Sequence, residues 1–260
     1  MRVLVTFAVD TEFAPWRKLR KFQPVRVTPT GSANTTEIWE TLVGDTAVSV
    51  YLTGIAGKFP REAMLFRESF YEKKSDFAIS SGLAGALNPA YVPGDVLAAS
   101  MTGTKDDSRD FPADAGLLRH AAAQSARIIR RLLTADRIIG HKEEKRLLSK
   151  DADAVDMESA LLMKGFAEIQ LPAIAIRAVS DGQAEDMPID FARCITSDGK
   201  VRSPQLIMEL ASHPSSIPSL IRFGRQSKRA AANLAAFLDG FISSLPEHVS
   251  NSRIHEVAVP

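Results

Sequence analysis

The chain has 260 residues, of which 32 are Lys or Arg and 31 are Asp or Glu, so its formal net charge is +1. This balance argues against a nucleic-acid-binding surface built on bulk positive charge, and the 45% of apolar residues is enough for a full core, which excludes disordered and low-complexity classes. The single cysteine, Cys194, excludes an internal disulfide and a multi-cysteine metal site and fits a reducing cytoplasm.

The chain begins with a short apolar run. Residues 2–9 are apolar but are followed by Asp10 and Glu12, which makes the run too short for a signal peptide and favours a buried first strand. No apolar run reaches the roughly 18 residues that a membrane-spanning helix needs. We therefore expect Glu12 to lie in a loop directly after the first strand.

Apolar, β-branched runs alternate with stretches of helical period. The segment 113–133 carries one apolar face, and 157–169 is apolar nearly all round, so both are predicted to be helices. The alternation predicts a three-layer α/β/α domain with a central mixed, mainly parallel sheet. The predicted strands are 2–9, 46–53, 76–81, 95–101, 135–139, 153–156 and 173–180.

From residue 203 onward the strand signal stops. Apolar residues recur at helical spacing in 217–245, which predicts one or two C-terminal helices packed on the domain. We find no internal repeat and no linker. The expected organisation is one domain at 1–245, with a helical extension at about 203–245, and a polar tail at 246–260.

Three functional motifs are absent from the sequence. The first strand runs into 8–12 without the glycines of a dinucleotide fingerprint. The run 54–58 has the wrong length for a phosphate loop and is followed by Phe59 instead of a hydroxyl residue. The histidines form no metal-binding pair, and we expect His120 and His141 to be ordinary surface or boundary residues. No metal and no organic cofactor is predicted.

Acidic residues stand at the ends of apolar strands, where open α/β sheets bind their ligands. Glu12 follows the first strand, Asp156 and Glu158 lie where a strand runs into a helix, and Asp181 ends a buried strand. Each position alone also has a structural explanation. Glu12 could be an exposed loop acid, and Asp181 could belong to a plain turn at the end of its strand. Asp156 could cap the helix that follows it, and Glu158 could interact favourably with the dipole of that helix. The joint order of these residues is more informative than any one of them.

That order resembles the purine nucleoside phosphorylase and methylthioadenosine/S-adenosylhomocysteine nucleosidase superfamily. The glutamate past the first strand, a glycine-rich turn at 80–87, Val-Asp-Met-Glu-Ser-Ala at 155–160 and Arg-Ala-Val-Ser-Asp at 177–181 carry the resemblance, which covers roughly residues 1–195. It implies an enzyme that cleaves the N-glycosidic bond of a purine nucleoside, most simply an adenine nucleoside. It also implies a homodimer or larger homo-oligomer with pockets near the subunit interfaces.

The resemblance implies a role for each matching residue. Asp181 is the general acid that protonates a five-membered-ring nitrogen of the leaving purine, and Glu158 holds the ribose hydroxyls. Glu12 resembles the nucleosidase glutamate that orients and deprotonates a water molecule. The implied substrate-binding set contains Met157 against the sugar, Ile138 and Ile139 against the base, Phe191 on the 5′ side, and Gly82, Leu83, Ala84, Gly85 and Ser180.

The chemistry of the bond supports these roles independently. Cleavage develops positive charge on the sugar while electrons flow into the base, so a proton donor is needed on one side and negative charge on the other. Burial beside Ile176 and Val179 favours the protonated form of Asp181, whereas Glu158 should stay ionised.

The nucleophile is either water or phosphate. An anionic Glu12 repels phosphate, and residues 8–14 lack the Gly-Asp-Pro loop of the phosphorylase branch, so hydrolysis is favoured. Leu83 replaces the serine that is usual in the nucleosidase glycine turn. Two alternatives stay open: phosphorolysis, and a nucleoside-binding protein without turnover. For phosphorolysis, the candidate phosphate ligands are the basic residues Arg17, Lys18, Arg20 and Lys21, which otherwise form a solvated basic loop.

The C-terminal part is similar to the tail of nucleoside phosphorylase-like proteins associated with hopanoid lipid synthesis. The similarity lies in 198–202 and 213–222 and implies a lipid-linked adenosyl substrate. It would bring the basic residues Arg222, Arg225, Lys228 and Arg229 near a membrane surface. A solvated helix face is the alternative that we favour, and the sequence does not identify the 5′ substituent.

Overall fold

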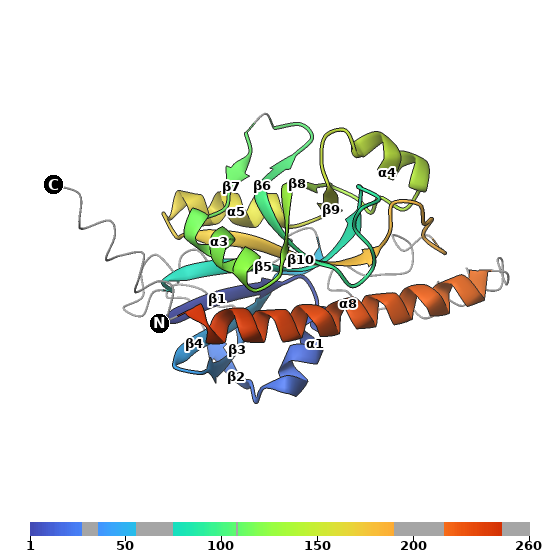
Figure 1. Ribbon diagram of the computed structural model, residues 1–260. Helices are drawn as coiled ribbons and strands as arrows, with labels where there is room; N and C mark the ends of the chain where they lie inside the picture. Colours follow the sequence, from blue (N-terminus) through green and yellow to red (C-terminus); the bar gives the residue numbers. More distant parts are fainter. Residues whose placement is uncertain (28–35, 56–74, 108, 190–215, 246–260) are drawn as a thin grey trace.

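The computed structural model describes residues 1–27, 36–55, 75–107, 109–189 and 216–245 (Figure 1). Parts of the predicted C-terminal extension, the predicted tail at 246–260 and Phe191 lie outside these residues. The elements, in chain order, are β1 (Arg2–Phe7), α1 (Asp10–Leu19), β2 (Gln23–Val27), β3 (Thr36–Val43), β4 (Thr46–Leu52), β5 (Phe77–Ala86), β6 (Val96–Thr104), β7 (Phe111–Pro112), α3 (Ala115–Ala123), β8 (Arg127–Thr134), α4 (Lys142–Leu148), β9 (Ala154–Asp156), α5 (Ser159–Glu168), β10 (Ala173–Asp181) and α8 (Ile217–Ser243).

A mixed sheet organises the fold, as the sequence predicts, and in the described residues it has ten strands where the sequence predicts seven. Strand β1 pairs in parallel with β4 on one side and β5 on the other, and β5 pairs in parallel with β10. Five strands close on themselves, because β10 pairs with β6, β6 with β8, β8 with β9, and β9 returns to β5. Small and branched side chains fill the space inside this ring: Ala84, Ala86, Leu97, Ala99, Ile129, Leu132, Ala154, Ala175 and Val179.

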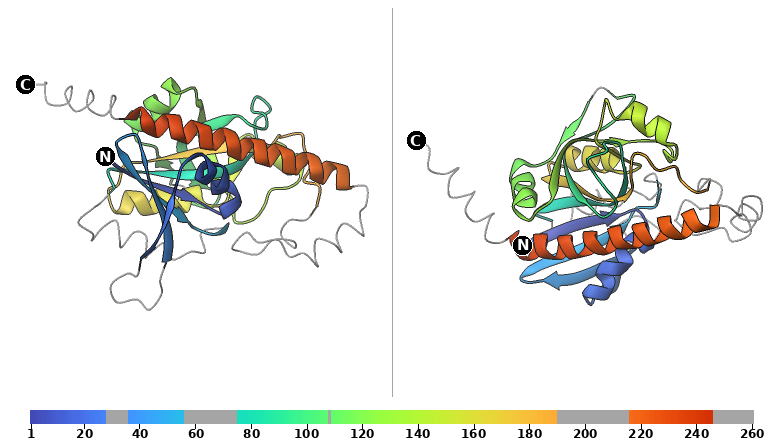
Figure 2. Two further views of the ribbon diagram at one scale, coloured as in Figure 1. Left: turned by 90° about the horizontal axis from the view of Figure 1, so that it is seen from below. Right: turned by 45° about the vertical axis from the view of Figure 1, so that its right-hand side comes forward.

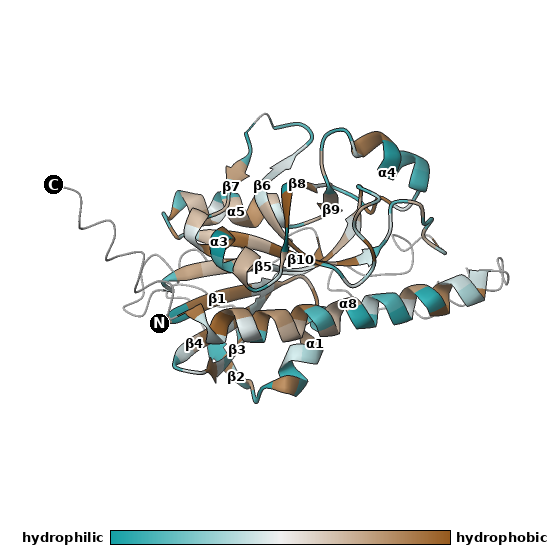
Figure 3. Ribbon diagram, in the orientation of Figure 1, coloured by the Kyte–Doolittle hydropathy of each residue, from teal (hydrophilic) through white to brown (hydrophobic). Residues whose placement is uncertain are grey.

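Helices cover both faces of the sheet (Figure 2). Helices α1, α3 and α8 share one apolar cluster with β1, β4, β5 and β10. Helix α5 packs on the opposite face through Leu162, Met163 and Phe166. The fully buried residues of helix α8 lie in its C-terminal half, from Ala230 onward, and the face of its N-terminal half that is seen in Figure 3 is mainly hydrophilic. None of the described helices is both long and apolar enough to cross a membrane.

Two sequence predictions around residue 130 are wrong. The predicted helix 113–133 is the short helix α3 followed by strand β8, and the predicted strand 135–139 is not a strand, because β8 ends at Thr134. In β8, Ile129 and Leu132 are buried while Arg130 is exposed. The buried residues Ile129 and Leu132 are three positions apart, a spacing that also occurs on one face of a helix. The apolar periodicity alone therefore does not distinguish a helix from a strand here.

The sequence also misses several elements. Residues 10–19, expected as a loop, form helix α1, and β2 and β3 extend the sheet beyond β4. The expected glycine turn at 80–87 is largely the second half of β5. His120, expected near the surface, is buried, and its Nε2 lies 2.9 Å from the carbonyl oxygen of Phe241. Its ring thus joins α3 to α8, whereas His141 is exposed, as expected.

Candidate active site

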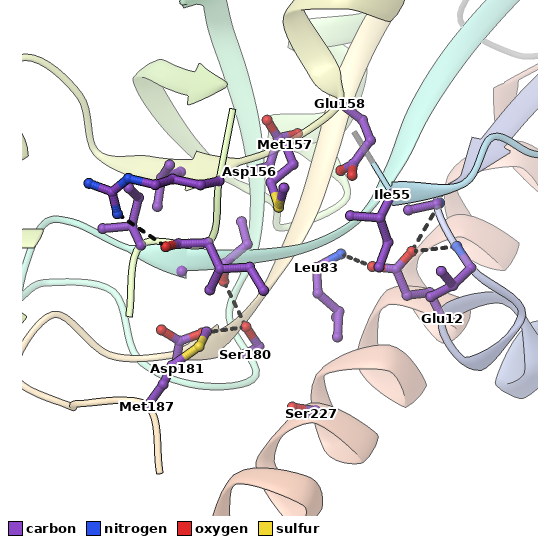
Figure 4. Close-up of a pocket in the computed structure, with 18 of the residues that line it drawn as sticks. Glu12, Ile55, Leu83, Asp156, Met157, Glu158, Ser180, Asp181, Met187 and Ser227 are labelled. Carbon is purple, nitrogen blue, oxygen red and sulfur yellow. Dashed lines mark hydrogen bonds between the residues drawn. The ribbon is translucent and has the colours of Figure 1, made fainter. Parts of the chain in front are cut away.

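A cavity of about 300 Å³ opens where residues that follow β1, β8 and β9 meet β5, the end of β10 and helix α8 (Figure 4). Three acidic side chains predicted from the sequence, those of Glu12, Glu158 and Asp181, line it together. The predicted binding residues Leu83, Ala84, Gly85, Ile138, Ile139, Met157 and Ser180 line it as well. Gly82 lies directly behind the lining, against the carboxylate of Glu12.

Glu12 lies in the first turn of α1 and is held by backbone N–H groups. Its Oε1 accepts a hydrogen bond from Leu83 N at 2.9 Å, and its Oε2 accepts from Ala8 N at 3.1 Å and Val9 N at 3.4 Å. Burial raises the pKa of this carboxyl above its ordinary value, and the Leu83 hydrogen bond and the positive charge of Arg177 only partly oppose that effect. A buried carboxylate with a raised pKa is suited to accept a proton near neutral pH.

Leu83 provides a main-chain hydrogen bond to the site but no side-chain hydroxyl. Its main-chain N–H binds Glu12, while its apolar side chain lines the cavity where the resemblance predicts a serine hydroxyl. The Glu12 carboxylate is therefore oriented by a main-chain N–H that any residue except proline would supply at position 83.

Asp156, which lines the cavity, and Arg177, which lies behind it, form a buried ion pair. Asp156 Oδ2 lies 2.8 Å from Arg177 Nη2 and also accepts from the N–H of Ser159, while its Oδ1 accepts from the hydroxyl of Thr134 at 2.7 Å. Arg177 donates further to Ser80 Oγ at 3.1 Å. Asp156 thus caps the N-terminus of α5, the structural role that its position in the sequence also suggests. The ion pair with Arg177 fixes the turn that carries Met157 and Glu158.

Glu158 occupies the N-cap position of α5, one residue before the first helical turn in which the sequence places it. The residue is 8% exposed, and its carboxylate extends toward the centre of the cavity near Ile55 (Figure 4). Met157 lies beside it on the same wall (Figure 4).

Asp181 ends β10 just after an irregularity in the pairing with β5, between Val179 and Asp181. Such a bulge re-aims the side chains that follow it. The hydroxyl of Ser180 lies 2.6 Å from Asp181 Oδ1. The second oxygen, Oδ2, forms an ion pair with Lys145 of α4, whose side chain is completely buried. The sequence places Asp181 beside the apolar residues Ile176 and Val179 and does not predict the lysine ammonium that contacts it.

Sequence reasoning misses several residues of the site. Lys145 stands in the charged run Lys-Glu-Glu-Lys-Arg at 142–146, which is typical of a solvated helix, and only the fold shows that this one lysine is buried. Arg177 is part of the motif at 177–181, but the sequence does not show that it pairs with Asp156. Ile55, Met187, Phe223 and Ser227 line the cavity from segments without a recognisable motif.

The two arginines that follow Glu12 have other partners, and neither Lys18 nor Lys21 lines the cavity. Arg17 pairs with Asp10 at 2.5 Å and Arg20 with Asp239 at 2.6 Å, and neither arginine lines the cavity. The described residues contain no group of three or more His, Cys, Asp or Glu side chains that is placed to hold a metal ion.

Solved structures with the same fold are numerous. The 5′-methylthioadenosine/S-adenosylhomocysteine nucleosidase of Neisseria meningitidis, in complex with methylthio-immucillin-A, superposes with a TM-score of 0.68 at 20% identity, over 94% of this chain and 99% of that chain. The S-adenosylhomocysteine nucleosidase of Streptococcus pyogenes gives 0.69 at 15%, over 95% and 98%. A mutant futalosine hydrolase of Helicobacter pylori gives 0.66 at 14%, over 93% and 98%. These similarities establish the fold.

The family of the chain follows from its sequence as a whole. No curated protein matches it significantly. The family model of the phosphorylase superfamily, however, matches residues 2–243, which span β1 to the end of α8 and include every strand that lines the cavity. The resemblance drawn from the short motifs is thereby confirmed: the chain belongs to the phosphorylase superfamily.

Proposed function

We propose that this protein hydrolyses the N-glycosidic bond of a purine nucleoside and releases adenine. Membership of the phosphorylase superfamily supports an enzyme that acts on nucleosides, and the solved nucleosidases and futalosine hydrolase with this fold support hydrolysis. The observation that carries the proposal is the placement of Glu12 and Asp181 on opposite sides of one cavity of about 300 Å³, a volume at the lower end of small-molecule sites (Figure 4).

In the proposed reaction each acid has a separate task. Glu12 takes a proton from a water molecule that attacks the anomeric carbon, and its raised pKa makes it a stronger base than an exposed glutamate. Glu158 binds the ribose hydroxyls, and its negative charge stabilises the positive charge on the sugar. Asp181 delivers a proton to the five-membered ring of the departing purine, which leaves as a neutral base.

Electrostatics favours water over phosphate as the nucleophile. Four carboxyl groups, those of Glu12, Asp156, Glu158 and Asp181, line the cavity, and Arg137 is the one basic residue of the described lining. Arg137 is paired with Glu144 at 2.5 Å. Two of the four carboxylates contact buried cations, Asp156 with Arg177 and Asp181 with Lys145. The four acids still outnumber these two cations, so a dianion entering beside Glu12 meets net negative charge, and phosphorolysis stays the second candidate.

The experiment offers the purified protein adenosine, methylthioadenosine and S-adenosylhomocysteine, with and without phosphate, and quantifies free base and sugar products by chromatography. We expect adenine and the free ribose derivative without phosphate. Glu12→Gln, which removes the proposed base, should lose this activity. Asp10→Asn is its matched control and should keep the activity, because Asp10 starts the same helix but is exposed and paired with Arg17. Release that requires phosphate and yields a ribose 1-phosphate would establish phosphorolysis. Tight binding of a nucleoside without base release would establish a binding protein.

Two further predictions accompany this proposal. We propose a homodimer or larger homo-oligomer; the exposed Leu147 and Leu161, the latter beside a second cavity of about 500 Å³, are apolar surface suited to a subunit contact. Light scattering tests the assembly.

A cytoplasmic location remains a prediction from the single cysteine. We do not propose membrane contact, because a solvated face accounts for the exposed Arg222, Arg225, Lys228 and Arg229 of α8.

A further inference from the structure

We propose that Lys145 supplies the proton that Asp181 gives to the leaving base. The inference rests on the proposed N-glycosidic cleavage and assigns a role to a residue that lies outside the motifs. Lys145 acts through Asp181, so it is a positioning and proton-supplying residue rather than one that contacts the substrate.

The position of Lys145 is fully determined by its contacts. Its Nζ forms the ion pair with Asp181 Oδ2 and also donates to the carbonyl oxygens of Gly182 at 3.0 Å and Glu185 at 2.9 Å. These three acceptors match the three N–H bonds of an ammonium group. The side chain has no exposed surface, so bulk water does not compete for the ammonium. The contacts hold the ammonium against the proposed acid and tie α4 to the segment that follows β10.

A second buried ion pair shows why the type of cation matters. Asp156 pairs with Arg177, and both side chains are almost completely buried. A guanidinium keeps its proton under all conditions that proteins meet, whereas a lysine ammonium is able to release one. The chain thus has arginine behind the cavity, where a charge orients a turn, and lysine on the acid, where a proton must move.

The proposed step conserves atoms and charge. As the bond between the anomeric carbon and the purine breaks, its electron pair moves into the purine ring. An N–H bond of Lys145 breaks and an O–H bond forms on Asp181; that O–H bond then breaks as an N–H bond forms on the purine. The ammonium becomes a neutral amine, Asp181 returns to a carboxylate and the base leaves neutral. The proton that Glu12 took from water returns through the solvent of the open cavity to Asp181, which lines it, and passes from Asp181 to the buried Lys145 amine, which restores the ammonium.

The decisive variant is Lys145→Arg, which keeps the positive charge and withholds the proton. We expect turnover of the adenine nucleoside to fall by about 10²–10⁴-fold, the usual contribution of a general acid. Turnover of 4-nitrophenyl β-D-ribofuranoside, whose leaving group departs without a proton, should fall less than about tenfold, since acid catalysis contributes little there. Lys142→Arg is the matched control, because Lys142 lies in the same helix but is partly exposed and pairs with Asp186; it should leave both rates unchanged.

A second variant, Lys145→Ala assayed with added ethylammonium, tests the inference if the Lys145→Arg variant does not fold. We expect a loss that ethylammonium partly restores, with saturation, while the thermal midpoint reports folding. Near-normal adenine release by Lys145→Arg would overturn the inference, as would equal losses on both substrates. If the unmodified protein releases no base from any nucleoside, the proposed function fails instead, so the two failures are distinguishable.

Discussion

Gly82 and Glu12 are in contact across the boundary between β5 and α1. A Cβ placed on Gly82 would lie 3.1 Å from Glu12 Oε1, and the φ of Gly82 is +150°, a conformation that other residues rarely adopt. The next residue, Leu83, donates its N–H to the same carboxylate oxygen. The glycine therefore sets how closely the proposed base approaches the strand that orients it.

Gly82→Ala should reduce both stability and turnover. Backbone strain in this region costs on the order of 1–3 kcal/mol, and the new methyl group pushes the Glu12 carboxylate away from the Leu83 N–H. Gly44→Ala is the control, since Gly44 also has a positive φ of 57° but has no atom within 4 Å of its added Cβ. We expect Gly44→Ala to lower the unfolding free energy without lowering kcat. Equal kcat values for the two variants would contradict the proposed contact.

Asp181→Asn should cost both activity and stability. Loss of the general acid reduces turnover by about 10²–10⁴-fold. The substitution also leaves the buried Lys145 ammonium without its carboxylate, and breaking such a pair typically costs about 3–5 kcal/mol.

The double variant Asp181→Asn with Lys145→Met separates these two effects. Because it removes both buried charges, it should recover much of the lost stability in urea unfolding and none of the lost turnover. A double variant no more stable than Asp181→Asn would show that the pair is not the source of the destabilisation.

The proposed site is more predictable from the sequence than the fold around it. Glu12, Glu158 and Asp181 are each next to a strand end that the apolar pattern marks, so short-range order suffices to find them. Strand β8 is different, since its burial follows from closure of five strands around a common interior, and that closure depends on pairings between segments far apart in the chain.

The partners of the acids are the least predictable part. Lys145 contacts Asp181 across 36 residues, and Arg177 contacts Asp156 across 21. A charged residue in a sequence is usually solvated, and nothing local distinguishes the buried Lys145 from the partly exposed Lys142 and the exposed Arg146 in the same helix. Only the tertiary structure shows which acidic residues are paired with a lysine or an arginine.

Glu12 should make both stability and activity depend on pH. Burial raises its pKa above the ordinary 4.5, so the folded protein binds this proton more tightly than the unfolded chain. Its contribution to stability is therefore full below pH 4.5 and is lost as pH rises through the folded pKa. The thermal midpoint of the unmodified protein, relative to Glu12→Gln, should decrease across that range. A constant difference in midpoint would contradict the raised pKa. Because the base must be ionised, kcat/KM should rise with pH over the same window.

Arg177 should set where that rise occurs. Its positive charge lowers the pKa of Glu12, so its removal raises this pKa further and moves the rise of kcat/KM to higher pH. Arg177→Met alone leaves Asp156 buried without its cation, at a cost of about 3–5 kcal/mol, so the measurement uses Arg177→Met with Asp156→Asn, which removes both charges. Arg177→Lys, which keeps a cation there, is the control and should shift the profile less. A kcat/KM profile of the double variant that overlays that of the unmodified protein would rule out this control of Glu12 by Arg177.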